Sequence, residues 1–219
     1  MTGVLIAMAA FVFSHVAIAR TTLKPAIVAR IGARGYLAIY SVVSIALLSW
    51  VIISLRSAER AVLWSPPLWS HAFAALATAA AFVLIGVGVA APNPLSVSIR
   101  QSGFDPDRPG AVGFVRHPLI WGLALWGLAH TPANGDWPSL VLFAGSAAFG
   151  AIGAPLVERR RRRALGEAAW RRMTAGRGAL DQNALLGAGA GLVLWAAFLL
   201  AHPLLFGVDP LAVLRAGAL

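Results

Sequence analysis

The stretch RHPLIWGLALWGLAHTPANGD spans residues 116–136 and holds an apolar segment, residues 118–129, with His117 before it and His130 after it. Proline is favoured at the first position of a helix, so Pro118 predicts a helix that starts directly after His117. With its flanks the segment is about 16 residues long, near the lower limit for crossing a bilayer. An ionisable side chain at membrane depth is a functional candidate by default.

The composition of the whole chain is that of a membrane protein. Of its 219 residues, 59% are hydrophobic and 12% are charged, and the mean hydropathy is +0.77. A soluble domain carries about twice that share of charge. Five further apolar segments have the length of a bilayer-crossing helix: they are residues 2–19, 36–55, 68–91, 137–157 and 186–206. The sequence therefore predicts an all-α, multi-pass protein with six transmembrane helices in one domain, residues 1–219.

The distribution of charge predicts the orientation. Of the 18 basic residues, only Arg56, Arg60 and Arg215 lie outside three loops, which are residues 20–35, 92–116 and 158–185. Loops rich in Lys and Arg stay in the cytoplasm, so both termini are expected outside the bacterial inner membrane. The formal net charge of +10 then needs no nucleic-acid partner. The predicted partners are the lipid bilayer and a hydrophobic small molecule.

The five histidines divide by predicted depth. His15 and His117 fall at the inner face, whereas the other three, His71, His130 and His202, fall near the outer face. A helix N-terminus and the neighbouring Arg116 both disfavour a protonated His117, and neutral imidazole is the form that binds iron. His15 and His117 are therefore predicted as opposed ligands of a haem b. The alternative is that each histidine caps a helix or binds a backbone carbonyl.

Three further local features are predicted. The basic run at residues 159–163 is expected to open an amphipathic helix that continues to about Met173 along the inner leaflet. Asp136 is expected to cap the helix that follows it. The small residues from Gly187 to Gly191 are expected to allow close helix packing. The chain has no cysteine, which excludes disulfides and thiolate metal sites.

Several of these motifs resemble the NnrU family of bacterial membrane proteins. They are Arg116 to Asp136, Phe13-Ser14-His15, Pro92-Asn93-Pro94-Leu95, and the run from Arg160 to Gly166 followed by Trp170. The resemblance implies an accessory role in nitrite and nitric oxide reduction. It also implies a haem-dependent, isomerase-like enzyme, because the plant relatives are 15-cis-zeta-carotene isomerases with a histidine-held haem b. His15 and His117, with Arg116 beside the latter, are the positions to which that site maps. The chain departs from the family at Arg177-Gly-Ala-Leu, where members often carry Pro-Phe.

A second resemblance leads to another enzyme class. Arg-His-Pro at a helix start, followed later by Glu158 and a Leu-Gly-x-x-x-Trp segment, is similar to isoprenylcysteine and phospholipid methyltransferases. It implies S-adenosylmethionine as cofactor and Arg116, His117, Glu158 and Glu167 as its binding residues. A third interpretation is a membrane scaffold without catalytic activity.

Overall fold

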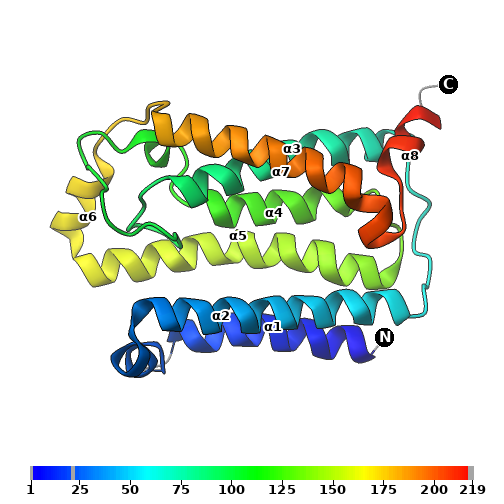
Figure 1. The fold of residues 1–219 in the computed structure, drawn as a ribbon, viewed down its shortest axis with the longest axis horizontal. Coiled ribbons are helices and arrows are strands. Elements are labelled where there is room, and N and C mark those ends of the chain that lie inside the picture. Colours follow the sequence, from blue (N-terminus) through cyan, green and yellow to red (C-terminus); the bar gives the residue numbers. More distant parts are fainter. Residues whose placement is uncertain (1, 21–22, 217–219) are drawn as a thin grey trace. The chain divides into compact units, whose positions relative to one another are not determined.

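The computed structural model describes residues 2–20 and 23–216, and it is all-α, as the composition predicts (Figure 1). Residues 21–22 of the predicted loop 20–35, and the terminal residues 1 and 217–219, lie outside the described residues. The elements are α1 (Thr2–Arg20), α2 (Leu23–Ser57), α3 (Leu68–Ala90), the 3-10 turn η1 (Gly110–Gly113), α4 (Pro118–His130), α5 (Trp137–Leu165), α6 (Glu167–Thr174), α7 (Gln182–Phe206) and α8 (Pro210–Ala216).

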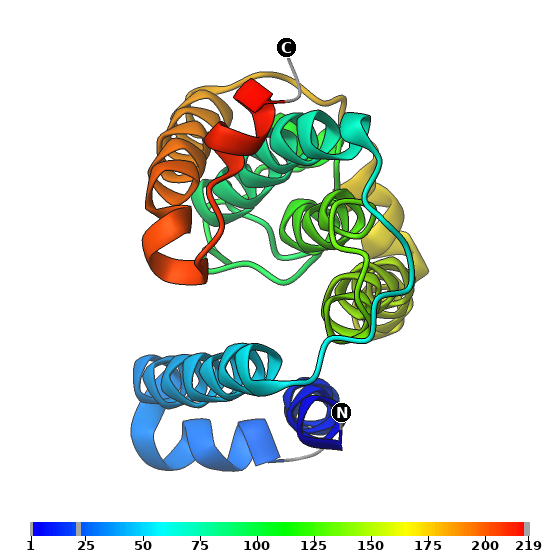
Figure 2. The same ribbon diagram turned by 90° about the vertical axis from the view of Figure 1, so that its right-hand side faces the viewer.

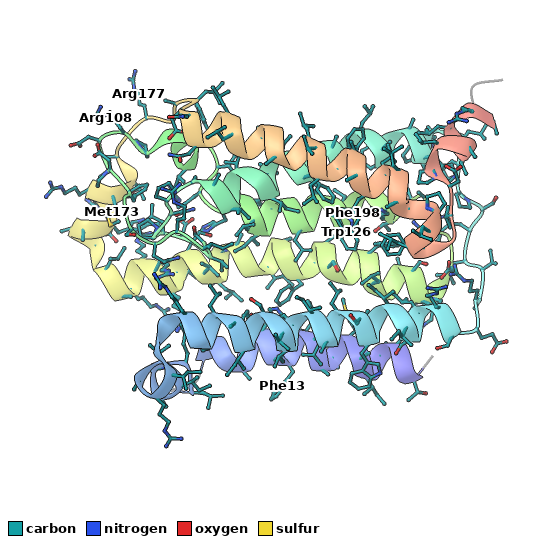
Figure 3. All side chains as sticks on the ribbon, viewed as in Figure 1. Phe13, Arg108, Trp126, Met173, Arg177 and Phe198 are labelled. Carbon is teal, nitrogen blue, oxygen red and sulfur yellow. The ribbon has the colours of Figure 1, made fainter. Side chains whose placement is uncertain are left out.

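Each of the six predicted apolar segments forms a helix. Four helical stretches in the described part of the chain are long and apolar enough to cross a membrane: Arg34–Ser57, Leu68–Ala90, Trp137–Leu165 and Gln182–Phe206. Thr2–Ala17 and Pro118–His130 are shorter apolar helices. Large apolar side chains point outward on several of them, and Phe13, labelled in Figure 3, is 72% exposed. These faces suit contact with lipid.

The chain divides into two compact units. Unit 1 comprises Met1–Ser65 and Gly135–Leu142, and α1 and α2 lie side by side in it. Asp136 organises the second segment of unit 1, because its carboxylate accepts hydrogen bonds from the backbone and hydroxyl of Ser139 at 2.9 and 3.0 Å. The predicted cap of α5 is thereby confirmed. Arg60 adds an ion pair to the same carboxylate at 3.0 Å.

Unit 2 comprises Pro66–Asn134 and Phe143–Leu219, and its main helices are α3, the shorter α4, α7 and most of α5 (Figure 2). The end of α3, the start of α4, the end of α5 and the start of α7 meet at one end of this bundle (Figure 1). The same end carries α6 and the loop of residues 91–117, and Arg108 and Arg177 project from it (Figure 3). The opposite end holds the start of α3 and the end of α4.

Glycines set the distance between α3 and α7. A Cβ atom added to Gly187 would lie 2.6 Å from the carbonyl oxygen of Gly86 and 2.8 Å from the Cα of Val87. A Cβ atom on Gly191 would collide with the carbonyl of Phe82. The predicted role of this small-residue segment is confirmed, since only glycine lets the two backbones approach so closely. Gly189, in the same segment, faces open space.

Two predicted boundaries need correction. Most of the predicted loop 20–35 is helical, since α2 begins at Leu23. Gly32, with φ of 75°, kinks this helix before its membrane-length part, Arg34–Ser57. The predicted amphipathic helix does not include the basic run. That run closes α5, which ends at Leu165, and Gly166 with φ of 79° separates it from α6. In both places a glycine adopts a conformation that other residues rarely reach, and charge patterns do not reveal it.

The glycines of α7 provide a matched test of the packing. Gly187→Ala should lower the free energy of unfolding by about 1–3 kcal/mol, because the new methyl group overpacks a backbone contact. Gly189→Ala should leave stability unchanged or raise it by up to about 1 kcal/mol, because alanine favours helix and the position is open. Thermal unfolding of the two purified variants measures the difference. Equal stabilities would show that α3 and α7 do not pack through these glycines.

Candidate functional site

Three predicted site residues meet at a single carboxylate oxygen in unit 2. The Nη1 of Arg116 donates to Oε2 of Glu158 at 2.9 Å, and Nε2 of His117 lies 3.3 Å from the same oxygen. Arg116 and His117 come directly before α4, and Glu158 lies seven residues before the end of α5. Pro118 at the first position of α4 holds His117 at the helix start, as predicted.

Ser96 completes the surroundings of His117. Its Oγ lies 2.8 Å from Nδ1, and both residues are buried. Glu158 accepts a hydrogen bond from Arg116 and is therefore an ionised carboxylate, which can only accept. The Nε2 atom of His117 must then carry the hydrogen in the bond to Glu158. In neutral imidazole Nδ1 then accepts from the Ser96 hydroxyl. This tautomer is assigned from the hydrogen-bond partners, and it makes His117 a donor toward Glu158.

Burial also keeps His117 neutral. The imidazole is 3% exposed, and this burial lowers its pKa below the usual 6.5; Glu158 acts in the opposite direction, while the charge of Arg116 adds to the lowering. The sequence predicted a neutral His117 from the helix start and Arg116. The structure supports the contribution of Arg116 and adds desolvation as the largest cause.

The loop after α3 fixes the position of Arg116. Asn93, 1% exposed, donates from Nδ2 to the carbonyl of Arg116 at 2.9 Å and accepts from the backbone of Leu95 at 3.0 Å. Its own backbone N–H donates to the carbonyl of Arg100. A buried amide with these partners ties the exit of α3 to the entrance of α4.

An aromatic ring from α6 covers Arg116. The guanidinium carbon lies 5.3 Å from the ring centre of Trp170, which is the distance of a cation–π contact. Trp170 is buried in an apolar cluster with Ala91, Leu95 and Val112. The sequence assigned no role to Ser96 or to the Trp170–Arg116 contact. Pro92-Asn93-Pro94 is one of the motifs of the NnrU resemblance, but only the folded chain shows which side chains this loop presents to Arg116 and His117.

Arg116, His117 and Glu158 lie in the wall of a pocket of about 870 Å³, whereas Ser96 and Trp170 support them from outside it. The polar part of its lining includes Arg116, His117 and Glu158. The apolar part comes from α3, α4 and α5 and includes Leu84, Trp121 and Ala154. A volume of this size accommodates a small-molecule cofactor. The arrangement offers a carboxylate, a guanidinium and an aromatic ring to one ligand.

Glu167, the fourth residue of the methyltransferase resemblance, does not line this pocket. It accepts hydrogen bonds from Arg162 at 2.6 and 2.8 Å and from Arg171 at 2.8 Å. These bonds lower the pKa of Glu167 to about 2. Its contacts join the end of α5 to α6, so its role in the structure is to orient α6.

The remaining histidines lie elsewhere. His15 belongs to unit 1, where its Nδ1 donates to the carbonyl of Phe11 at 2.8 Å and its ring contacts Tyr40. His130 and His202 each donate to a backbone carbonyl at 2.9 Å, as the alternative interpretation expects. No group of three or more potential metal ligands gathers within residues 2–20 and 23–216. The pairing of His15 with His117 on one haem stays a prediction.

The neutral state of His117 makes stability depend on pH. As pH falls below about 6.5, the unfolded chain binds a proton at residue 117 that the folded chain still refuses, so the free energy of unfolding should fall. Thermal unfolding of the solubilised protein from about pH 8 to about pH 5 measures this. His117→Gln should flatten the decline, whereas His71→Gln, at the opposite end of unit 2, should retain it. An unchanged slope in His117→Gln would contradict the assignment.

The comparisons with known proteins agree with this architecture. The model of the NnrU family, described as NnrU protein, matches residues 4–210. No curated protein and no solved structure matched the chain. The family match covers nearly the whole sequence, including most of both units and every residue of the pocket. This chain, with its apolar helices and its Arg116–His117–Glu158 cluster, therefore belongs to the NnrU family of membrane proteins.

Proposed function

We propose that the pocket of unit 2 binds S-adenosylmethionine and that the protein is a membrane methyltransferase. The observation that carries this proposal is the meeting of Arg116, His117 and Glu158 at the pocket wall, although Glu158 is 42 and 41 positions away from the other two in sequence. Three of the four residues mapped from the methyltransferase resemblance lie together. Glu167 is the exception and is assigned no part in binding.

The charges of the pocket suit this cofactor. Arg116 and His117 both bind Oε2 of Glu158, and no described residue donates to Oε1 of the same carboxylate. Oε1 is therefore available to a cationic group of a ligand. A guanidinium such as that of Arg116 has the geometry to bind the carboxylate of a ligand. Trp121, which is 41% exposed and lines the pocket, offers a face for a purine ring.

In this mechanism the residues of the pocket would bind the cofactor and orient it. When bound, S-adenosylmethionine supplies an electrophilic methyl group on a positively charged sulfur. Glu158 stabilises positive charge in the pocket, and His117 holds the carboxylate in place through its Nε2–H. Ser96 fixes the tautomer that allows this.

Calorimetry with the purified protein tests the proposal. Wild-type protein should bind S-adenosylmethionine, and Glu158→Gln should weaken binding at least about tenfold, because it removes a charge and keeps the shape. Glu167→Gln, which removes a carboxylate outside the pocket, should bind like wild type once thermal unfolding shows that both variants are folded. Failure of the wild-type protein to bind would contradict the methyltransferase assignment.

Haem binding is the second candidate, and it would support an accessory role in nitrogen-oxide reduction or an isomerase-like activity. The observation in its favour is the neutral, buried His117. The hydrogen bonds oppose it, because Nε2 carries the proton that binds Glu158, and ligation of iron through Nε2 requires this carboxylate to move. A Soret band lost in His15→Ala and His117→Ala, and kept in His71→Ala, would establish haem. Absence of both ligands would leave the scaffold interpretation.

We further propose that all six apolar helices cross the bacterial inner membrane, with both termini outside. The support is the charge distribution: the end of unit 2 that carries α6 also holds the basic run 159–163, and basic segments remain in the cytoplasm. Reporter fusions should place Arg163 inside and the turn at Gly135 outside. A periplasmic reporter that is active after Arg163 would reverse the orientation.

A further inference from the structure

The lining of the pocket changes character along α5. Ala151, Ala154 and Pro155 supply an apolar wall, and Glu158, Arg159 and Arg162 supply a charged one. From Ala151 to Arg159 the helix rises about 12 Å. α3 and α5, which both line the pocket, are long and apolar enough to cross a membrane. The pocket thus joins apolar depth to a charged rim at one end of the helices.

The three arginines of the pocket differ in their partners. Arg116 is paired with Glu158, and Arg162 is paired with Glu167. Arg159 is exposed, and it has no carboxylate partner in the part of the chain that the structure describes. Within the described residues, the rim therefore carries the guanidinium of Arg159 without an ion pair.

The rest of the basic run does not share this position. Arg160 and Arg163 are exposed but do not line the pocket. Arg161 donates to the carbonyl of Ser96 and to Gln101, so its guanidinium serves the loop after α3. If the basic run only anchored the protein to anionic lipid, each of its exposed arginines would have the same role. Arg159 and Arg160 are both exposed, but Arg159 lines the pocket and Arg160 does not.

We infer that the pocket takes an amphiphile as a second ligand, with its apolar chain along α3, α4 and α5 and an anionic headgroup on Arg159. The inference rests on the proposed function in assigning this amphiphile to the same site as the cofactor. A volume of about 870 Å³ lies toward the upper end of the range for small-molecule pockets, so it has room for part of a second molecule. A ligand with an apolar chain reaches such a pocket from the bilayer.

Dodecyl phosphate is a suitable probe, tested without S-adenosylmethionine on the full-length protein in an uncharged detergent. Native mass spectrometry should detect one bound probe per protein. Arg159→Gln should reduce its affinity about tenfold or more, because a charge-assisted contact is lost. Arg160→Gln, the adjacent exposed arginine outside the pocket, is the matched control and should bind the probe like wild type.

Three outcomes would overturn the inference. Equal loss in Arg159→Gln and Arg160→Gln would assign the binding to a general basic surface. Competition by inorganic phosphate at concentrations similar to those of the probe would assign the site to a free anion without an apolar chain. Absence of bound probe would remove the amphiphile altogether. Binding that depends on Arg159 in a protein that does not bind S-adenosylmethionine would instead sustain this inference and contradict the proposed function.

Discussion

The Oε2 atom of Glu158 is the point on which the organisation of unit 2 depends. It accepts from Arg116 and lies within hydrogen-bond distance of His117, so the end of α5 is joined to the start of α4. Both side chains of the Arg116–Glu158 pair are 35% exposed, so solvent screens the ion pair, and its main effect is to fix the geometry between the two helices. The cluster therefore constrains where the ends of both helices lie.

The segments around this cluster depend on it in turn. Asn93 and Ser96, from the loop after α3, bind the backbone of Arg116 and the ring of His117. Trp170, from α6, lies against the guanidinium of Arg116. Three separate parts of the chain, the loop after α3, α5 and α6, thus meet around two consecutive residues. Buried polar groups that are fully paired favour one arrangement over its alternatives, and this explains how a long irregular loop is held in place.

The remainder of unit 2 packs by a different principle. α3 and α7 approach through Gly86, Gly187 and Gly191, and α4 approaches α5 where Gly127 faces the backbone of Phe143 and Ala147. In lipid, burial of apolar surface gives little preference for helix contact, so close backbone approach supplies the attraction. Polar pairing at one end and small residues along the helices together leave a pocket between α3, α4 and α5.

The sequence by itself determined where the apolar helices lie and where some of them begin. Hydropathy located all six apolar helices, because a membrane requires long apolar segments and each leaves a local signal. Pro118 and Asp136 marked the starts of two helices, since helix-start prolines and caps act within a few residues. The NnrU resemblance singled out Arg116 and His117, and the methyltransferase resemblance added Glu158 and Glu167. Local pattern failed at Gly32 and Gly166, where backbone conformation, not composition, breaks the helix.

Only the tertiary structure decided which of these residues belong together. No local pattern joins Ser96 to His117 or Trp170 to Arg116, because these contacts link segments separated by loops whose paths depend on packing. It also presented Glu158 and Glu167 as equivalent, and the fold assigns one to the pocket and the other to the α5–α6 junction. Short-range sequence signals determine where helices form. Which distant polar groups pair depends on how the helices pack, because packing brings those groups within hydrogen-bond distance.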